Sequence, residues 1–462
     1  MKTKTGKPLK NSEHKIEITD VTAKGFGVGN IHGFTIFVDG ALPGDNLRIL
    51  ILKVKTSYGY GKILEIVSPS PWRIASPCNL SGHCGGCQFQ HCEYSEQLHF
   101  KKRLVLDALE RIGGVKNPPV LDVFGMDEPF NYRNKAVFPV VPSEDSQGFA
   151  IGMYAARSHR IVRVSECIIQ HPAHVFVLNE LKEHMKTHKI SPYDETIHKG
   201  LVRHVIIRTS LSTGEIMVVL VINGESLPME QDFCEKLTEH GATTVIINPN
   251  KSKGNVILGD KFRVLSGTGF IHERIGHVEY GLSAQTFFQV NPVQTKILYD
   301  TAVSQAGLTG TEIVMDAHVG AGGIALYTAN KAKKIIGVDI VSSAISDAQK
   351  NAALNGVQNA KFICGAAEEI IPEMLANAEE SNLLIPDVIF LDPPRKGCEP
   401  ELLNAIIAAK IEKIVYVSCD PATLARDIKM LVAGGYQVVV AQPVDMFPMT
   451  GKVETSVLLV IK

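Results

Sequence analysis

The feature that most constrains the fold is a regular alternation in the last third of the chain. After about residue 290, short apolar segments typical of buried strands alternate with stretches of helical spacing, such as SAISDAQKNAALNG at 343–356. This alternation predicts a doubly wound α/β sheet of parallel strands, in which ligands bind at the carboxyl ends of the strands. The apolar segments are EIVMDA (312–317), KIIGVDI (334–340), DVIFLDPP (387–394), KIVYVSC (413–419) and YQVVVAQPVDMF (436–447).

The first 68 residues have a different pattern, in which short β-type runs are separated by Gly-rich punctuation such as KGFGVGN and YGYG. Five or so such strands predict a small closed barrel of the OB-like kind. The prolines of SPSPWR (68–73) mark a linker, FKKRLVLDALERIGG (100–114) has helical spacing, and 118–280 has a mixed α/β pattern. For 462 residues we therefore expect three domains, 1–68, 69–280 and 281–462.

The charge is unevenly distributed along the chain. The formal net charge of -1 argues against a uniformly basic nucleic-acid binder, but residues 1–68 hold ten Lys/Arg against six Asp/Glu, whereas 281–462 hold 14 against 19. No segment approaches the roughly 18 to 20 apolar residues of a membrane helix, and no apolar stretch follows the N-terminal lysines as in a secretion signal. We therefore expect a cytoplasmic protein with a basic N-terminal barrel.

The cysteines are also unevenly spaced. Four of the nine, Cys78, Cys84, Cys87 and Cys92, fall within fifteen residues. In a chain without a secretion signal, such a cluster indicates metal binding or redox chemistry rather than a disulfide framework.

A cofactor site is predicted where the segment IVMDAHVGAGGIAL (313–326) leads from a strand through a Gly-rich turn into a helix. Gly320, Gly322 and Gly323 would let a ligand approach the backbone closely, and Asp339 follows about twenty residues later at the end of the next strand, where a carboxylate can accept both ribose hydroxyls. This spacing alone is also consistent with a dinucleotide-binding site or with a purely structural turn. The strict G-x-G-x-x-G is absent, and no Gly-Lys-Ser/Thr follows to make a P-loop.

Two further strand ends carry residues suited to base chemistry. Asp392-Pro393-Pro394-Arg395 makes a rigid loop that can hold a planar ring, and together with the Gly-rich turn it favours S-adenosylmethionine-dependent methylation of a nucleobase over a capped turn. Cys419 ends the next strand just before a helix, whose N-terminus favours a thiolate.

These residues suggest a covalent mechanism at uracil. Carbon 5 of uracil is a poor nucleophile, and a thiolate that adds to carbon 6 activates it. Glu454, the one acidic residue in the apolar run of the last strand, is the candidate base that removes the carbon 5 proton. The plain alternatives are an inert buried cysteine and a Glu that points to water at a strand edge.

The motifs as a set resemble those of the RNA (uracil-5-)-methyltransferases of the RumA/TrmA type. The similarity extends over nearly the whole chain, including a basic N-terminal barrel similar to the TRAM domain. The motifs are SAQTFFQVNPVQTKILY (283–299), VIFLDPPRKGCEPELL (388–403), VYVSCDPATLARD (415–427), VDMFPMTGKVETSVLL (444–459) and the spacing C-x5-C-x2-C that starts at Cys78.

The resemblance implies roles for matching positions. It makes Cys419 the nucleophile and Glu454 the base, and it gives Asp392 a part in holding the target uracil and the cofactor. Gln289 would contact the methionine part of S-adenosylmethionine, and Phe287 or Phe288 would lie near the target base. Asp339 would hold the ribose, and the turn that contains His318, Gly320 and Gly323 would complete the cofactor site.

The resemblance also implies a metal cofactor. In the family, three clustered cysteines and one distant cysteine hold a 4Fe-4S cluster, which here gives Cys78, Cys84, Cys87 and Cys167; zinc is the alternative for four thiolates. Cys92 has no place in this pattern. The expected role of the cluster is structural or in RNA positioning, since uracil methylation needs no electron transfer.

The chain departs from the family pattern at two places. His318 replaces an aromatic residue in the Gly-rich turn, which bears on cofactor affinity, and Met449 and Lys452 replace two histidines ahead of Glu454. The change at Lys452 bears on the pKa of Glu454.

We therefore expect a monomeric enzyme that methylates carbon 5 of a uridine in RNA, with ribosomal RNA (23S) favoured over transfer RNA. The alternatives are a transfer RNA uridine methyltransferase, an RNA-binding or RNA-folding factor that has lost methylation, and a nicotinamide-dependent oxidoreductase. In each RNA-binding case the basic barrel would supply affinity for the RNA backbone.

Overall fold

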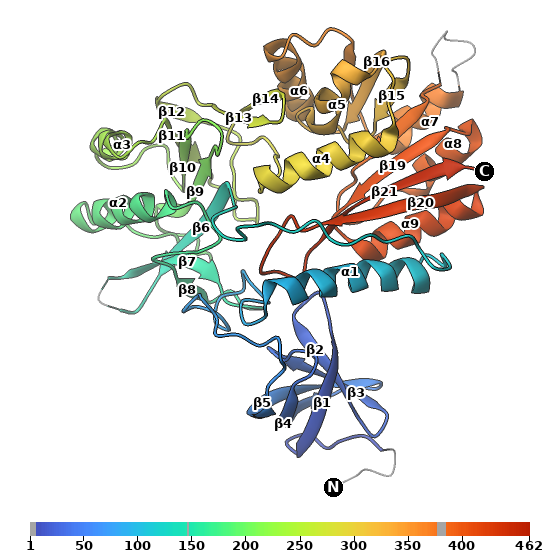
Figure 1. The fold of residues 1–462 in the computed structure, drawn as a ribbon. Coiled ribbons are helices and arrows are strands. Elements are labelled where there is room, and N and C mark those ends of the chain that lie inside the picture. The colour runs from blue at the N-terminus through green and yellow to red at the C-terminus, as the bar shows by residue number, and fades with distance from the viewer. Residues whose placement is uncertain (1–5, 146, 377–384) are drawn as a thin grey trace.

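The computed structural model describes residues 6–145, 147–376 and 385–462. Figure 1 shows a small barrel at the N-terminal end, a central sheet, and a second sheet that contains the C-terminus. The predicted fold class is confirmed: a closed barrel is followed by a mixed α/β region and a doubly wound sheet.

The N-terminal barrel has five strands that close in the order β1-β2-β3-β5-β4. Alternate residues of the strands point inward and form a compact aliphatic core that includes Ile16, Ile36 and Ile49. The strands are β1 (Glu13–Val21), β2 (Phe26–Ile31), β3 (Phe34–Asp39), β4 (Asn46–Val54) and β5 (Tyr58–Ser68).

Strand β2 differs from the sequence-based expectation, because it consists of the segment that was interpreted as Gly-rich punctuation. Its glycines allow the strands to approach closely: a Cβ at Gly27 would lie 2.7 Å from the Cβ of Ala41, and one at Gly29 would lie 2.5 Å from the carbonyl oxygen of Glu17. Glycine therefore marks tight packing here, not a chain reversal.

The central sheet has seven strands in the order β12-β11-β10-β9-β6-β7-β8. Every residue of β9 and β10 is buried, because both faces of the sheet are covered. Helices α2 (His174–Thr187) and α3 (Glu230–Glu239) cover one face. The strands are β6 (Lys135–Pro142), β7 (Phe149–Tyr154), β8 (Ile161–Arg163), β9 (Val202–Thr209), β10 (Ile216–Ile222), β11 (Thr244–Pro249) and β12 (Arg263–Ser266).

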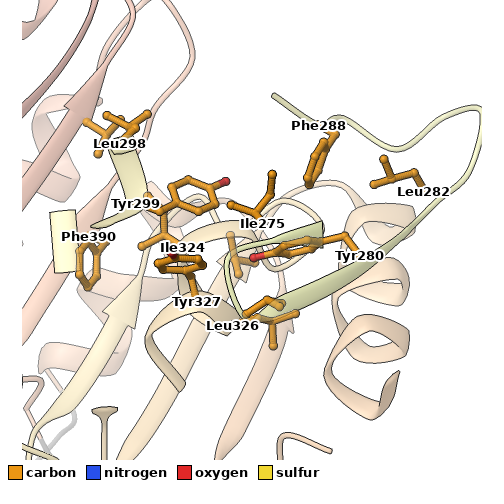
Figure 2. Close-up of a cluster of buried hydrophobic side chains, with 14 of the residues drawn as sticks. Ile275, Tyr280, Leu282, Phe288, Leu298, Tyr299, Ile324, Leu326, Tyr327 and Phe390 are labelled. Atoms are coloured by element: carbon orange, nitrogen blue, oxygen red, sulfur yellow. The ribbon is translucent and has the colours of Figure 1, made fainter. Parts of the chain in front are cut away.

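The other face of the central sheet packs against a hairpin, β13 (Ile271–Ile275) and β14 (Val278–Leu282). The same hydrophobic cluster continues into the C-terminal sheet, so one core joins the two regions. Figure 2 shows part of it, with Tyr280 of the hairpin near Ile324 and Leu326.

The C-terminal sheet has seven strands in the order β17-β16-β15-β18-β19-β21-β20. It is parallel, as expected, except that β21 runs antiparallel to both its neighbours. The strands are β15 (Ile313–Asp316), β16 (Lys334–Asp339), β17 (Ala360–Cys364), β18 (Val388–Leu391), β19 (Lys413–Ser418), β20 (Tyr436–Val444) and β21 (Glu454–Ile461).

Helices cover both faces of this sheet, as a doubly wound fold requires. On one face lie α4 (Pro292–Ala306), α5 (Gly323–Thr328), the short 3₁₀ helix η1 (Ala329–Lys331) and α6 (Ser342–Leu354). On the other lie α7 (Ala367–Ala376), α8 (Pro400–Ala409), α9 (Pro421–Ala433) and α1 (Tyr94–Arg111).

Helix α1 comes early in the chain but packs on the C-terminal sheet, against α9 and β20. Its Lys101 is fully buried and forms an ion pair of 2.5 Å with Asp445, which follows β20. The Tyr94 hydroxyl donates to the other carboxylate oxygen of Asp445 at 2.9 Å. In the described part of the chain, no helix is long and apolar enough to cross a membrane.

Candidate active site

Two candidate catalytic side chains leave the C-terminal sheet at the same edge, on neighbouring strands. In the antiparallel pair β19–β21, Ser418 is the partner of Thr455. Since β21 runs against β19, its first residue, Glu454, lies where β19 ends and Cys419 begins the next loop. Asp392 follows β18, the parallel neighbour on the other side of β19. The register thus brings together Asp392, Cys419 and Glu454.

Cys419 lies half-buried before the first turn of α9, as the sequence predicted. Burial, and then the nearby carboxyls of Glu454 and Asp392, raise the pKa of its thiol to about 11. The Asp420 side chain accepts two of the backbone N–H groups in the first turn of α9. The expected preference for a thiolate is therefore not found, because burial and the neighbouring carboxyls disfavour the charged thiol, and the Asp420 side chain already accepts from the helix N-terminus.

Glu454 is buried at the start of β21. Burial raises its carboxyl pKa well above the usual value, and the negative charge of Asp392 adds to this, while Lys452 and Arg395 oppose it. The sequence-based alternative, a Glu that points to water at a strand edge, is excluded by its 4% exposure. A carboxylate whose pKa is raised binds a proton more strongly than an ordinary one, which suits a general base.

Asp392 begins the Pro-rich loop after β18. The loop turns back tightly, with Gly397 at φ +78° and its N–H donating to the carbonyl of Pro394 at 2.8 Å. Burial raises the pKa of Asp392 to about 7. Two acidic groups with raised pKa values, beside a thiol, are typical of a site that moves protons.

Cations frame this acidic group; from the sequence, Lys452 was expected to bear on the pKa of Glu454, whereas Arg395 and Arg133 had no assigned role. Burial lowers the pKa of Lys452, followed by the charges of Arg395 and Arg133, whereas Cys419 and Glu454 raise it. The signal was present in the sequence, since Lys452 stands two residues before Glu454 and Arg395 three residues after Asp392.

The Gly-rich turn after β15 is tied to the end of β16. Asp339 Oδ2 accepts from Gly320 N at 2.9 Å and its Oδ1 accepts from Val341 N at 2.8 Å. Asp316, buried at the end of β15, accepts from the backbone of the same turn at 3.2 Å. The two acidic residues therefore hold the turn in place at the carboxyl edge of the sheet.

Gly323 has a packing reason to be glycine. A Cβ there would lie 2.5 Å from the Tyr299 hydroxyl, and the carbonyl of Gly323 accepts from the Tyr280 hydroxyl at 2.8 Å. Figure 2 shows both side chains in one cluster, Tyr299 from helix α4 and Tyr280 from the hairpin. Gly320 has φ +53° and open space around its Cβ position, so a ligand could approach it.

The surroundings of this turn fit S-adenosylmethionine. His318 is largely buried with a Nδ1 that has no hydrogen-bond partner, and burial lowers its pKa to about 4, so the ring is neutral. Directly after Asp339, the side chains of Ile340 and Val341 are 68% and 50% exposed, which suits the face of an adenine ring. The sequence reasoning gave these two apolar residues no role, although an apolar pair after an acidic strand end was visible.

The segment between the hairpin and α4 carries the remaining predicted residues. Phe287 is 76% exposed, whereas Phe288 is buried and packs on Tyr280 with ring centroids 5.2 Å apart. Of the two aromatic candidates, only Phe287 is therefore free to meet a ligand. Gln289 is held through its backbone carbonyl, which accepts from Asn134 Nδ2 at 3.1 Å.

The four predicted metal ligands come together away from this edge. Cys78, Cys84, Cys87 and Cys167 line one cavity of about 320 Å³. Burial raises the pKa of the Cys87 thiol to about 12 and also that of Cys84 and Cys167. Cys92 is not part of the cavity; it is 1% exposed in a small core with Phe89 and Phe100.

The described sulfurs are not gathered closely enough for three of them to share one ion as they stand. Among the described residues, no three of the cysteines have sulfurs within 4.8 Å of one another. Two sulfurs on a single zinc at about 2.3 Å can be at most about 4.6 Å apart. Arg133 and Lys135 also line the cavity, and their positive charges would favour an anionic group bound by thiolates.

The doubly wound sheet, the Gly-rich turn and the acidic strand ends define a methyltransferase of the S-adenosylmethionine-dependent kind. The family model for tRNA (uracil-5-)-methyltransferases matches residues 93–462, and the TRAM domain model matches residues 9–64. The chain belongs to the tRNA (uracil-5-)-methyltransferase family and is an RNA methyltransferase.

Relatives match over the full length. An uncharacterized RNA methyltransferase of Halalkalibacterium halodurans is 45% identical over 457 residues, 98% of each chain, and one of Clostridium acetobutylicum is 43% identical over 454 residues, 97% of each. Among solved structures, the tRNA (uracil-54, C5)-methyltransferase of Pyrococcus abyssi in complex with S-adenosyl-L-homocysteine is 28% identical, with a TM-score of 0.76 and coverage of 96% of this chain and 99% of that one.

Proposed function

We propose that the enzyme methylates carbon 5 of a uridine in RNA through a covalent adduct with Cys419. The observation that carries this proposal is the pairing of Ser418 with Thr455, which puts a thiol and a buried carboxyl side by side at the ligand-binding edge of the sheet. A cysteine and a base are the two groups that methylation of carbon 5 requires.

The residues of this chain would act in sequence. The Cys419 thiol loses its proton to solvent, and the thiolate adds to carbon 6 of uracil. The electron pair of the carbon 5–carbon 6 double bond moves into an enolate with the carbon 4 oxygen, so carbon 5 becomes nucleophilic. When bound, S-adenosylmethionine supplies an electrophilic methyl group. Glu454 then takes the proton from carbon 5, the C–H electron pair forms the carbon 5–carbon 6 double bond, and the sulfur leaves as a thiolate. The raised pKa of Glu454 makes it a stronger base for this step than an ordinary carboxylate.

Recognition residues surround these two groups. Asp392 is within the electrostatic reach of both and would hold the uracil and the cofactor. Exposed Phe287 would stack on the target base, which must be unstacked from the RNA to reach the site. Gln289 would contact the methionine part of the cofactor, while Asp339 and the exposed Ile340 would hold its ribose and adenine.

The N-terminal barrel would bind RNA outside the active site. Four half-buried aromatic rings, Phe26, Phe37, Tyr58 and Tyr60, form one patch on the outer side of β2, β3 and β5, with neighbouring centroids 5.5 to 6.4 Å apart. Arg157 of the central region lies over the Phe26 ring, 4.5 Å from its centroid. Aromatic faces next to arginine bind single-stranded bases by stacking.

We further propose that Cys78, Cys84, Cys87 and Cys167 hold a 4Fe-4S cluster with a structural role. The common cavity and the resemblance of the cysteine spacing to that of the family support this. The three parts 1–68, 69–280 and 281–462 would then serve RNA binding, cluster binding and catalysis, in a monomer that acts in the cytoplasm.

Ribosomal RNA is the substrate class that we propose, on the resemblance of the motifs. Transfer RNA is the second candidate, favoured by the likeness to the archaeal enzyme. Mass-spectrometric mapping of 5-methyluridine in both RNA classes, from cells with and without this protein, tests the proposal. Loss of 5-methyluridine from 23S RNA is expected; loss confined to transfer RNA would select the second candidate, and no loss from either would contradict the activity.

A further inference from the structure

Three side chains with metal-binding atoms meet between α2 and α3, on the outer face of the central sheet and away from the catalytic edge (Figure 1). His184 and His188 are four residues apart at the end of α2, so they share one helix face, and their ring centroids are 4.5 Å apart. Asp232 belongs to the first turn of α3. One ligand atom from each of the three lies within 4.8 Å of the others.

His184 is held in the tautomer that a metal needs. Its Nε2 lies 2.8 Å from the carbonyl oxygen of Pro228, and because a carbonyl only accepts, Nε2 must carry the hydrogen. In a neutral ring, Nδ1 then has a free lone pair. A hydrogen bond from the other ring nitrogen to a backbone carbonyl is the usual way in which proteins orient a metal-binding histidine.

The Nδ1 atom of His184 is a buried acceptor with no partner. The side chain is 1% exposed, and Nδ1 makes no hydrogen bond, the nearest carboxylate oxygen of Asp232 being 3.9 Å away. At 3.9 Å, Asp232 is too far from this atom for a hydrogen bond. A buried lone pair without a donor is destabilising, and a cation would satisfy it.

We propose that His184, His188 and Asp232 bind a Zn²⁺ ion that joins α2 to α3. Two imidazole nitrogens and one carboxylate oxygen are a ligand set that zinc prefers, with water in the fourth position. His188 and Asp232 are both partly exposed and can shift by the small distance that Zn–N and Zn–O bonds of about 2.0 to 2.2 Å require. The site is separate from the four-cysteine cavity, since none of its ligands lines that cavity.

The Lys236 side chain would compete with zinc for the carboxylate of Asp232. Lys236 Nζ lies 3.1 Å from Asp232 Oδ2 and is partly exposed. Zinc binding would displace this ammonium from the carboxylate. Substitution of Lys236 should therefore strengthen zinc binding, an effect in the opposite direction to loss of a ligand.

The test uses the full-length protein, purified without oxygen so that the cysteine site keeps its own group. Zn²⁺ is titrated by calorimetry, and bound zinc is counted after gel filtration. Asp232→Asn and His188→Ala should each lower the affinity of one zinc equivalent per chain by at least tenfold, and Lys236→Gln should raise it. The matched control is His99→Ala, which removes an imidazole 3.0 Å from Glu96 on α1 where no second imidazole is present.

Cobalt(II) separates the proposed site from the cysteines. Co²⁺ bound by thiolates gives a sulfur-to-metal charge-transfer band, whereas Co²⁺ at the proposed site gives only weak visible bands, which Asp232→Asn should remove. Zinc affinity and visible cobalt bands that are the same in the wild type, Asp232→Asn and His188→Ala would overturn the proposal, provided that circular dichroism shows the variants folded.

Discussion

Ser418 of β19 and Thr455 of β21 are backbone partners, and the residues that extend this pair toward the ligand edge are Cys419 and Glu454. Only the antiparallel direction of β21 makes this possible, because it starts where β19 ends. A parallel last strand would carry its first residue to the opposite edge of the sheet.

Replacement of Cys419 by Ala should abolish methyl transfer. Without the sulfur, carbon 5 of uracil is not activated, and a loss of at least about 10³-fold in kcat is expected for removal of a nucleophile. Tritium transfer from labelled S-adenosylmethionine to RNA measures it. S-adenosylmethionine should still bind with a similar Kd, and residual transfer near the wild-type rate would contradict the covalent mechanism.

Replacement of Glu454 by Gln should stop the reaction one step later. The adduct can form and accept the methyl group, but the carbon 5 proton is not removed, so kcat should fall by about 10² to 10⁴-fold and a covalent protein–RNA complex should accumulate. Denaturing electrophoresis detects that complex. The matched control is Cys419→Ala/Glu454→Gln, which should form none; a complex that also appears in the double variant would contradict the assignment of Cys419.

The reaction rate should rise with pH. Both Glu454 and Cys419 must lose protons, and burial raises both pKa values, the thiol to about 11, so the active form gains population as pH increases through the neutral and alkaline range. Asp392→Asn removes a negative charge that raises both pKa values, so its kcat/KM profile should shift to lower pH although the rate falls. A profile that is flat from pH 6 to 9, or an unshifted one in Asp392→Asn, would contradict this electrostatic account.

Substitution of Gly323 by Ala should destabilise the protein by about 1 to 3 kcal/mol, as overpacking does. The new methyl group would lie 2.5 Å from the Tyr299 hydroxyl. Tyr299→Phe removes that oxygen and should recover much of the loss in the double variant. Denaturant melts of the four proteins give the coupling; purely additive effects would show that the contact is not the cause.

Protein purified without oxygen should be brown and hold about four irons per chain. Cys84→Ser, Cys87→Ser and Cys167→Ser should each lose colour and iron, while Cys364→Ser, which changes an exposed cysteine, should keep both. Iron analysis and visible absorption measure this. Colourless wild-type protein with stoichiometric zinc at these cysteines would refute the cluster.

Much of the fold was predictable because buried parallel strands appear in the sequence as apolar runs, and the residue that ends or follows each run lies at the carboxyl edge of the sheet. Asp339, Asp392 and Cys419 were placed at that edge in this way. Strand β2 was missed because glycine has two physical uses: Gly27 and Gly29 allow close packing between strands, and composition does not distinguish this from a turn.

The protonation of the site residues was less predictable from the sequence than their identity. A cysteine before a helix suggested a thiolate, but the pKa of Cys419 depends on Glu454, which is 35 residues later in the chain, and on Asp420, which caps the same helix. The choice between Phe287 and Phe288 likewise needed the packing of Phe288 against Tyr280 of the hairpin.

The buried ion pair of Lys101 and Asp445 links helix α1 to the loop between β20 and β21. The loop that leads to Glu454 is held by helix α1, which lies some 340 residues earlier in the chain. A fragment that lacks α1 would bury the Asp445 carboxylate without its Lys101 partner, which would lower the free energy of unfolding by about 3 to 5 kcal/mol. The C-terminal sheet can therefore reach its working shape only against a surface that the much earlier helix α1 provides. A fragment that contains this sheet but lacks α1 should not substitute for the whole chain.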